Sequence, residues 1–205
     1  MITQATDMPG SMQAREKLNE AVYFLAGLRD SSQNPQEFNY NLSAFVSALH
    51  SVFDLMLFDF AEKYSMGITR EDRITDDVFG FVAKALQNQN ALNFLNCWRT
   101  NLNQLNQNSL FRKRSLILHR GYAPTEQVYA VNPSGTITGS TQPWTQPVPH
   151  TSNNTAALPT ASPASRFEIY FPDIANQSAL DACELLLNEV RRFVETIERN
   201  YWSQR

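Results

Sequence analysis

The chain has 205 residues, of which 42% are hydrophobic and 18% are charged, with 17 Lys and Arg against 20 Asp and Glu. This length and composition indicate one domain whose hydrophobic core can hold it without disulfide bonds. Cys97 and Cys183 lie far apart with no CxxC motif or Cys/His cluster, which argues against a structural zinc site and a disulfide framework. Polar residues interrupt the longest apolar stretches, and the first residues have neither a basic start nor an apolar core. We therefore expect no membrane association and a cytoplasmic location.

Apolar residues at three- and four-residue steps predict two helices in the first third of the chain, over residues 13–30 and from Pro35 to about Met66-Gly67. Proline suits the first turn of a helix, and glycine is the residue that most easily ends one. A third, shorter helix should follow Thr75 as its cap.

Three further helices are expected in the rest of the chain. A face through Leu92, Leu95 and Leu105 predicts a fourth helix, on which Trp98 belongs to the core. A fifth should run from residue 108 or 109 to 121, and the last should start at Ser178 and continue to the end of the chain.

Residues 122–171 have a different composition. Strand-like runs at 128–131 and 136–138 flank a turn, which predicts a β-hairpin, and residues 166–171 should form a returning strand. Between them, residues 132–165 hold six of the ten prolines and twelve Ser or Thr, with no Asp, Glu, Lys or Arg, which indicates a mobile or irregular surface loop. The whole pattern predicts an all-α fold: one domain over residues 1–205, an up-and-down bundle of four to five helices, with this insertion before the last helix.

The charge is unevenly distributed. Residues 78–125 contain six basic side chains and no acidic one, so the rest of the chain carries 11 − 20 = −9. One interpretation is that the basic segment binds an anionic ligand such as phosphate. The other is that it complements acidic helices of the same chain or of a partner.

Few residues could carry catalysis. The sequence has no glycine-rich phosphate loop and no HExxH, GxSxG or EF-hand motif. We expect His50 to pack within the second helix and His150 to be solvated and without function. The carboxylates of that helix should face solvent or pair with arginine; they are Asp54, Asp59 and Glu62.

His119 closes the most basic stretch of the chain, residues 112–121. Arg114 precedes it by five positions and Arg112 by seven. An imidazole can move protons near neutral pH, and a guanidinium can hold a phosphate and stabilise the charge that develops on it. Together they are a minimum for RNA cleavage without a metal ion or cofactor, since the 2′-hydroxyl is the nucleophile. Alternatively, these cations only stabilise the end of a helix.

The segment from Arg114 to Gly121 and the order of the helices resemble the HEPN superfamily, whose signature is Arg, four to six residues, then His near a helix end. The segment Tyr40-Asn-Leu-Ser-Ala-Phe-Val-Ser-Ala-Leu-His-Ser is similar to bacterial HEPN-like proteins. The resemblance covers most of the chain outside residues 122–165. Many relatives have Asn after the Arg, where this chain has Ser115.

The resemblance implies a metal-independent endoribonuclease, often a toxin or defence component, that acts as a homodimer with the Arg/His helices facing each other. Arg114 and His119 would be catalytic and Ser115 supporting, while the substrate phosphate would be bound by Arg112, Lys113 and Arg120. It also implies an RNA substrate and an antitoxin or nucleotidyltransferase partner. Because some members bind nucleotides or proteins without cleaving RNA, a non-catalytic helical dimerisation or binding module is the alternative.

Overall fold

The computed structural model describes residues 12–31, 34–68, 73–114, 117, 128–131, 137–139, 166–169, 171, 174 and 177–202. The four long helices in these ranges are α1 (Met12–Asp30), α2 (Pro35–Lys63), α4 (Gln89–Leu105) and α7 (Ala179–Ile197). Two shorter ones are α3 (Asp76–Ala85) and α5 (Ser109–Arg112), and a π-helical turn, η1 (Glu198–Trp202), extends α7. The all-α prediction is confirmed.

Side-chain caps explain where several helices begin. Thr75 and Ser178, both expected as caps, accept hydrogen bonds from the backbone N–H groups of Val78 and Asp181 at 3.2 and 3.1 Å. Asparagine does the same before α2, α4 and α5, at Asn34, Asn88 and Asn108. Each cap satisfies N–H groups that have no partner within the helix, which fixes the first turn.

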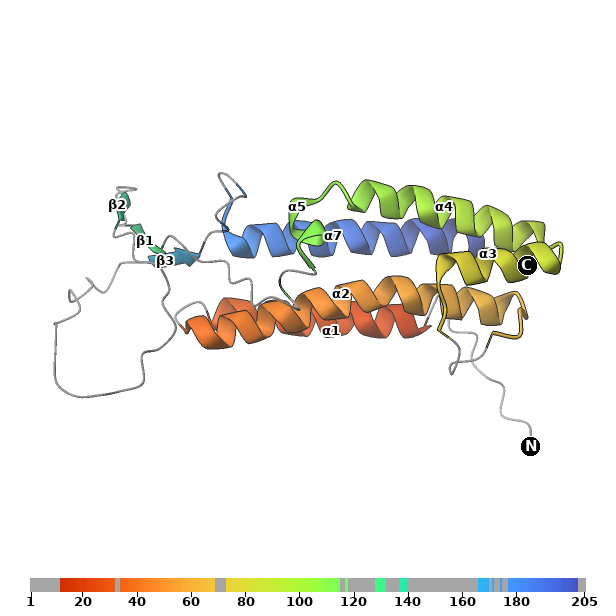
Figure 1. Ribbon diagram of the computed structural model, residues 1–205. Coiled ribbons are helices and arrows are strands. Elements are labelled where there is room, and N and C mark those ends of the chain that lie inside the picture. Colours follow the sequence, from red (N-terminus) through yellow and green to blue (C-terminus); the bar gives the residue numbers. More distant parts are fainter. Residues whose placement is uncertain are drawn as a thin grey trace, which may run out of the picture.

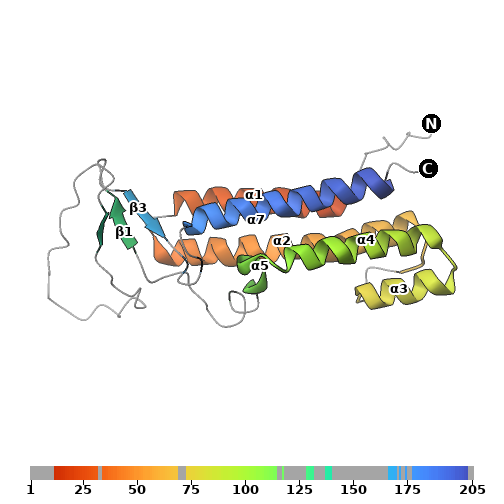
Figure 2. The same cartoon turned by 90° about the horizontal axis from the view of Figure 1, so that it is seen from above.

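The four long helices form an up-and-down bundle (Figures 1 and 2). Helices α1 and α2 are antiparallel, since the start of α1 bonds to Asp59 near the end of α2. Helices α1 and α7 are also antiparallel, because Arg29 pairs with Glu184 while Arg15 pairs with Glu198. The two views together place α2 beside both α1 and α4, and α7 beside both α1 and α4.

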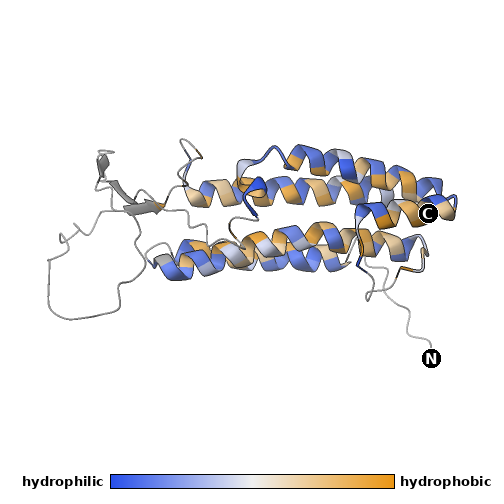
Figure 3. Ribbon diagram, in the orientation of Figure 1, coloured by the Kyte–Doolittle hydropathy of each residue, from blue (hydrophilic) through white to orange (hydrophobic). Residues whose placement is uncertain are grey.

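Aromatic side chains of α2 fill the centre of the bundle. Phe38, Phe45, Phe53 and Phe60 are each 0–1% exposed, and burial of each such side chain contributes roughly 1.5–3 kcal/mol. Phe60 stacks on Phe94 of α4 with ring centroids 4.0 Å apart. Hydrophobic positions on the long helices accordingly line their facing sides (Figure 3).

Helix α2 is long and apolar enough to cross a membrane by length and composition alone, and it is the one described helix that is. In the bundle, 61% of the apolar window is buried, as in the central helix of many bundles. The expectation of no membrane partner remains a prediction.

The expected single helix over residues 108–121 is interrupted. Helix α5 ends after one turn because the N–H of Lys113 bonds to the carbonyl of Leu110 at 3.1 Å, a tighter i to i+3 pattern. A helical bond then joins Ile117 N–H to the carbonyl of Lys113 at 2.9 Å. The chain thus turns just before Arg114.

Three short strands lie within residues 122–171, most of which fall outside the described residues. Strand β1 (Val128–Val131) pairs antiparallel with β2 (Ile137–Gly139) and with β3 (Arg166–Ile169), in the order β2-β1-β3. Helix α7 follows, beginning as expected at the Ser178 cap.

Candidate functional site

The structure describes some of the predicted site residues and not others. Arg112 is exposed on α5, and Lys113 and Arg114 are half-buried just after it. Ser115, His119 and Arg120 lie outside the described residues. The expected meeting of Arg114 with His119 therefore stays a prediction.

Arg114 instead contacts the second histidine candidate. Its Nη1 atom is within hydrogen-bonding distance of Nε2 of His50, which lies on α2, 64 positions earlier. A guanidinium has only donors, so Nε2 must be the acceptor and the imidazole proton must sit on Nδ1. We call His50, Arg114 and the neighbouring Asp54 the His50/Arg114 site.

Aromatic side chains pack against the His50 ring and against one another. The ring stacks on Phe111 of α5, with centroids 5.7 Å apart and planes 8° from parallel. Phe53 meets Phe111 edge-on at 5.4 Å and packs against Phe193 of α7 at 5.0 Å. The half-buried position expected for His50 is confirmed, and these rings restrict it to one orientation.

This environment keeps the imidazole neutral. Burial, and then the positive charge of Arg114, lower the pKa of His50 from 6.5 to about 4. Burial also lowers the pKa of Arg114 from its usual value, although the nearby Asp54 carboxylate opposes this. At neutral pH the pair is therefore a neutral acceptor beside a permanently charged donor that is partly removed from water.

Asp54 stands one helical turn after His50 on the same face of α2 and is exposed. Although its side chain reaches solvent, partial desolvation by neighbouring atoms raises the pKa of Asp54, and the charges of Arg114 and of Arg73, just before α3, lower it. Neither arginine forms an ion pair with it among the described residues, in which the ion pairs involve Arg15, Lys17, Arg29 and Arg99. Two cationic side chains, Arg73 and Arg114, therefore lie near the exposed Asp54 of α2.

Asn108 sets the position of α5, whose Phe111 packs on His50. Its Oδ1 accepts hydrogen bonds from the N–H groups of Leu110 and Phe111 at 3.0 and 3.2 Å. Its Nδ2 donates to Glu189 of α7 at 2.8 Å. One side chain therefore both starts α5 and ties it to α7, which sets where Phe111 and Arg114 lie.

A second polar cluster lies at the other end of α2, and it corrects the expectation for Asp59. Asp59 is 5% exposed, and its carboxylate accepts from Ala14 N–H at 3.2 Å and from Gln13 Nε2 at 3.0 Å. It does not face solvent, and no described arginine pairs with it, since its carboxylate caps free N–H groups at the start of α1. Burial raises its pKa from 3.8 to about 6 in spite of these hydrogen bonds.

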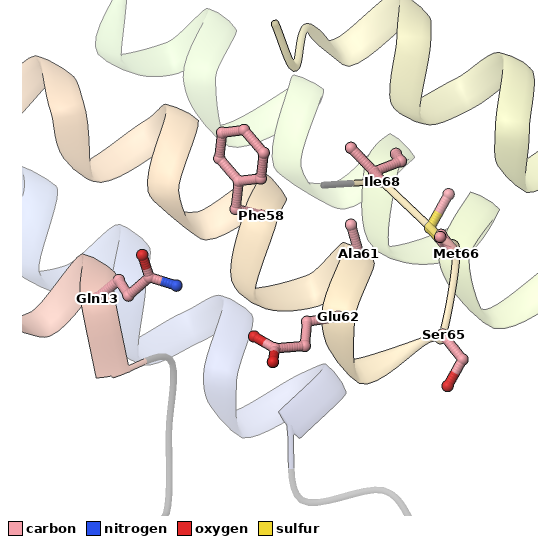
Figure 4. Close-up of a pocket in the computed structure, with 8 residues that line it drawn as sticks. Gln13, Phe58, Ala61, Glu62, Ser65, Met66 and Ile68 are labelled. Atoms are coloured by element: carbon pink, nitrogen blue, oxygen red, sulfur yellow. The ribbon is translucent and has the colours of Figure 1, made fainter. Parts of the chain in front are cut away.

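A cavity of about 360 Å³ lies beside this cluster. Figure 4 shows Gln13 and Glu62 on one side of it and Met66 and Ile68 on the other. Among the described residues that line it, Glu62 is the one charged group, and none of them is a cation that would bind a phosphate. Within the described ranges, no three His, Cys, Asp or Glu side chains come together as a metal ion would need.

Comparisons with protein families, curated proteins and solved structures found no match to this chain. The His50/Arg114 site therefore has to be interpreted from its own geometry. The sequence indicated Arg114 but missed His50 as its partner. The available signal was the spacing of His50 and Asp54, which puts an imidazole and a carboxylate one turn apart on the same face of the helix.

Proposed function

We propose that this chain is a metal-independent endoribonuclease that binds RNA at the His50/Arg114 site and cleaves it with Arg114 and His119. The observation that carries the proposal is the Arg114 guanidinium, which a neutral imidazole holds and which has no ion pair among the described residues. No described carboxylate neutralises its charge at short range, and partial burial strengthens its attraction for an anion. A phosphodiester is an anion that a guanidinium binds with two parallel hydrogen bonds.

The chemistry requires only groups that the substrate and the chain supply. The 2′-hydroxyl attacks the adjacent phosphorus, the 5′-oxygen leaves, and the products are a 2′,3′-cyclic phosphate and a 5′-hydroxyl end. His119 takes the proton from the attacking hydroxyl or gives one to the leaving oxygen. Arg114 stabilises the charge that builds on the non-bridging oxygens. DNA is not cut because deoxyribose lacks the nucleophile.

His50 acts as a positioning residue in this proposal. By accepting a hydrogen bond from Arg114 it orients the guanidinium without neutralising it, as a carboxylate would. Exposed Arg112 would contact phosphates further along the strand, as would Lys113 and Arg120. Ser115 supports the Arg/His segment.

The HEPN resemblance extends the proposal beyond the single chain. It adds a homodimer and a cognate antitoxin or nucleotidyltransferase partner, in a cytoplasmic toxin–antitoxin or defence system. None of these additions is needed for the cleavage test.

The test is cleavage of labelled single-stranded RNA by purified protein in excess EDTA. We expect cleavage by the wild type, and a loss of at least about 100-fold in His119→Ala and Arg114→Ala. The matched controls, His150→Ala and Arg29→Ala, should cleave at the wild-type rate. Melting temperatures should stay unchanged in the His119→Ala and His150→Ala proteins.

Two outcomes would overturn the proposal. One is full cleavage by His119→Ala, which would indicate a contaminating nuclease. The other is binding without cleavage across varied RNAs, which would favour the non-catalytic binding module. For His50, we expect His50→Ala to slow cleavage about tenfold and His50→Gln, which keeps an acceptor, to restore it.

A further inference from the structure

Helix α3 presents apolar side chains to solvent on its outer face. Phe81 is 75% exposed, Val78 is 39% exposed, and Ala85 is also exposed. These residues follow three- and four-residue steps, so they form one stripe along the helix. Figures 1 and 2 show α3 at one end of the bundle, on its outside.

The inner face and the start of α3 hold this stripe rigidly in place. Phe79 and Ala83 are 0% exposed. Gly80 lies so close to α4 that an added Cβ would be 2.9 Å from Leu95 Cδ2. Arg99 of α4 donates to both Asp76 and Asp77, at 2.7 and 2.9 Å. The stripe is therefore presented without an ordering step, which lowers the entropic cost of binding.

The charges on the same face are arranged for self-pairing. Asp77 and Lys84 are exposed, and they stand four residues before and three residues after Phe81. Arg99 occupies only Oδ1 of Asp77, and the Asp77 side chain is 92% exposed, so its carboxylate can also face a second copy. An antiparallel pair of such helices puts each Asp77 opposite the Lys84 of the other copy, with the two Phe81 rings in the centre. It also sets each helix N-terminus beside a C-terminus, which the helix dipoles favour.

We propose that α3 is a two-fold interface at which it pairs antiparallel with α3 of a second copy. A two-fold contact requires one self-complementary patch, and this stripe has an acid at one end, a base at the other and apolar groups between. Two ten-residue helices bury less than the roughly 1,200 Å² of a stable interface, so the association should be weak and concentration-dependent. This surface is separate from the basic segment, and the proposal does not depend on RNA cleavage.

The first test is sedimentation velocity across a concentration series up to about 1 mM, the range in which weak interfaces associate. We expect a reversible, concentration-dependent doubling of mass in the wild type that is lost in Phe81→Glu, whether the species that doubles is the monomer or the homodimer of the proposed function. Tyr23→Glu is the matched control, since Tyr23 is an equally exposed aromatic residue on α1, at 73%. A wild-type mass that does not change with concentration, or an association that Tyr23→Glu disrupts as much as Phe81→Glu, would overturn the proposal.

The second test uses charge reversal and does not depend on how Phe81→Glu folds. Lys84→Glu and Asp77→Lys should each weaken self-association about tenfold, because each places like charges opposite one another in both halves of the pair. Asp77→Lys also removes the Asp77–Arg99 contact, but the pair of Arg99 with Asp76 still joins α3 to α4. An equimolar mixture of the two variants should recover the wild-type affinity, since both halves are then complementary. If the mixture associates no better than either variant alone, the antiparallel pairing is wrong.

Discussion

Arg15 and Arg114 differ in the groups that their guanidinium side chains contact. Arg15, on α1, forms hydrogen bonds from Nε to both carboxylate oxygens of buried Glu198, at 3.0 and 3.1 Å. Arg114 meets neutral His50 and, within the part of the chain that the structure describes, has Asp54 as a more distant negative charge. The first arrangement balances charge and joins α1 to the π-helical turn after α7. The second leaves Arg114 without a described carboxylate partner, which is why the proposed function rests on Arg114 and not on Arg15.

The largest effect on stability should come from removing Arg15, whose charge is balanced by Glu198. In Arg15→Ala, the Glu198 carboxylate, 6% exposed, loses its guanidinium, and we expect the free energy of unfolding in urea to fall by about 2–3 kcal/mol. Arg29→Ala is the control, because both side chains of the Arg29–Glu184 ion pair are exposed. Its free energy of unfolding should fall by less than about 0.5 kcal/mol. Equal losses in the two variants would contradict a structural role for the Arg15–Glu198 pair.

Asp59 belongs to the same end of the bundle and should give stability a particular pH dependence. Its pKa is raised from 3.8 to about 6, so the folded state holds this proton more tightly than the unfolded state. The stabilisation is complete below pH 4 and is lost as the pH rises through 6. The Asp59→Asn variant should not show this pH-dependent loss, which amounts to up to about 2 kcal/mol. Its free energy of unfolding, relative to that of the wild type, should therefore rise between pH 4 and pH 6. A difference that does not vary with pH would show that Asp59 does not titrate there.

His50 should produce the opposite slope over nearly the same range. Its pKa is lowered from 6.5 to about 4, so the unfolded state takes up the proton first and stability is lost as the pH falls from 6.5 towards 4. Since the ring is only half-buried, we expect the effect to be no more than about 1–2 kcal/mol. Chemical denaturation at several pH values should show that the free energy of unfolding of His50→Gln falls less than that of the wild type between pH 6.5 and pH 4. A His50 signal that titrates near pH 6.5 by NMR would contradict the neutral, buried imidazole.

The smallest effect distinguishes a cap near the site from a cap elsewhere. Asn108→Ala and Asn88→Ala each remove a helix N-cap and should each lower the unfolding free energy by about 1 kcal/mol. Only Asn108 positions Phe111 and Arg114, so only Asn108→Ala should also raise the pKa of His50 towards its usual value, as measured by NMR. Identical His50 titrations in the two variants would mean that α5 does not set the geometry of the site.

Local patterns predicted the helices well, for physical reasons. The apolar stripe of α2, its proline at the start, and the caps Thr75 and Ser178 each act within a few residues. The contacts that define the two polar clusters act over long separations. Arg114 meets a residue 64 positions away, and Asp59 caps a helix whose first turn is 45 positions earlier. Periodicity cannot reveal which distant side chain will reach a free N–H group or a guanidinium.

The most direct test of the contrast between the two arginines is an NMR titration of their Nε–Hε signals. The probe is a single-stranded oligonucleotide with deoxyribose at every position, which offers phosphodiesters but cannot be cleaved. We predict that the Arg114 signal shifts in a saturable, salt-sensitive manner together with that of His50, while the Arg15 signal does not move. An unchanged Arg114 signal at saturating oligonucleotide, or equal shifts at both arginines, would contradict the account.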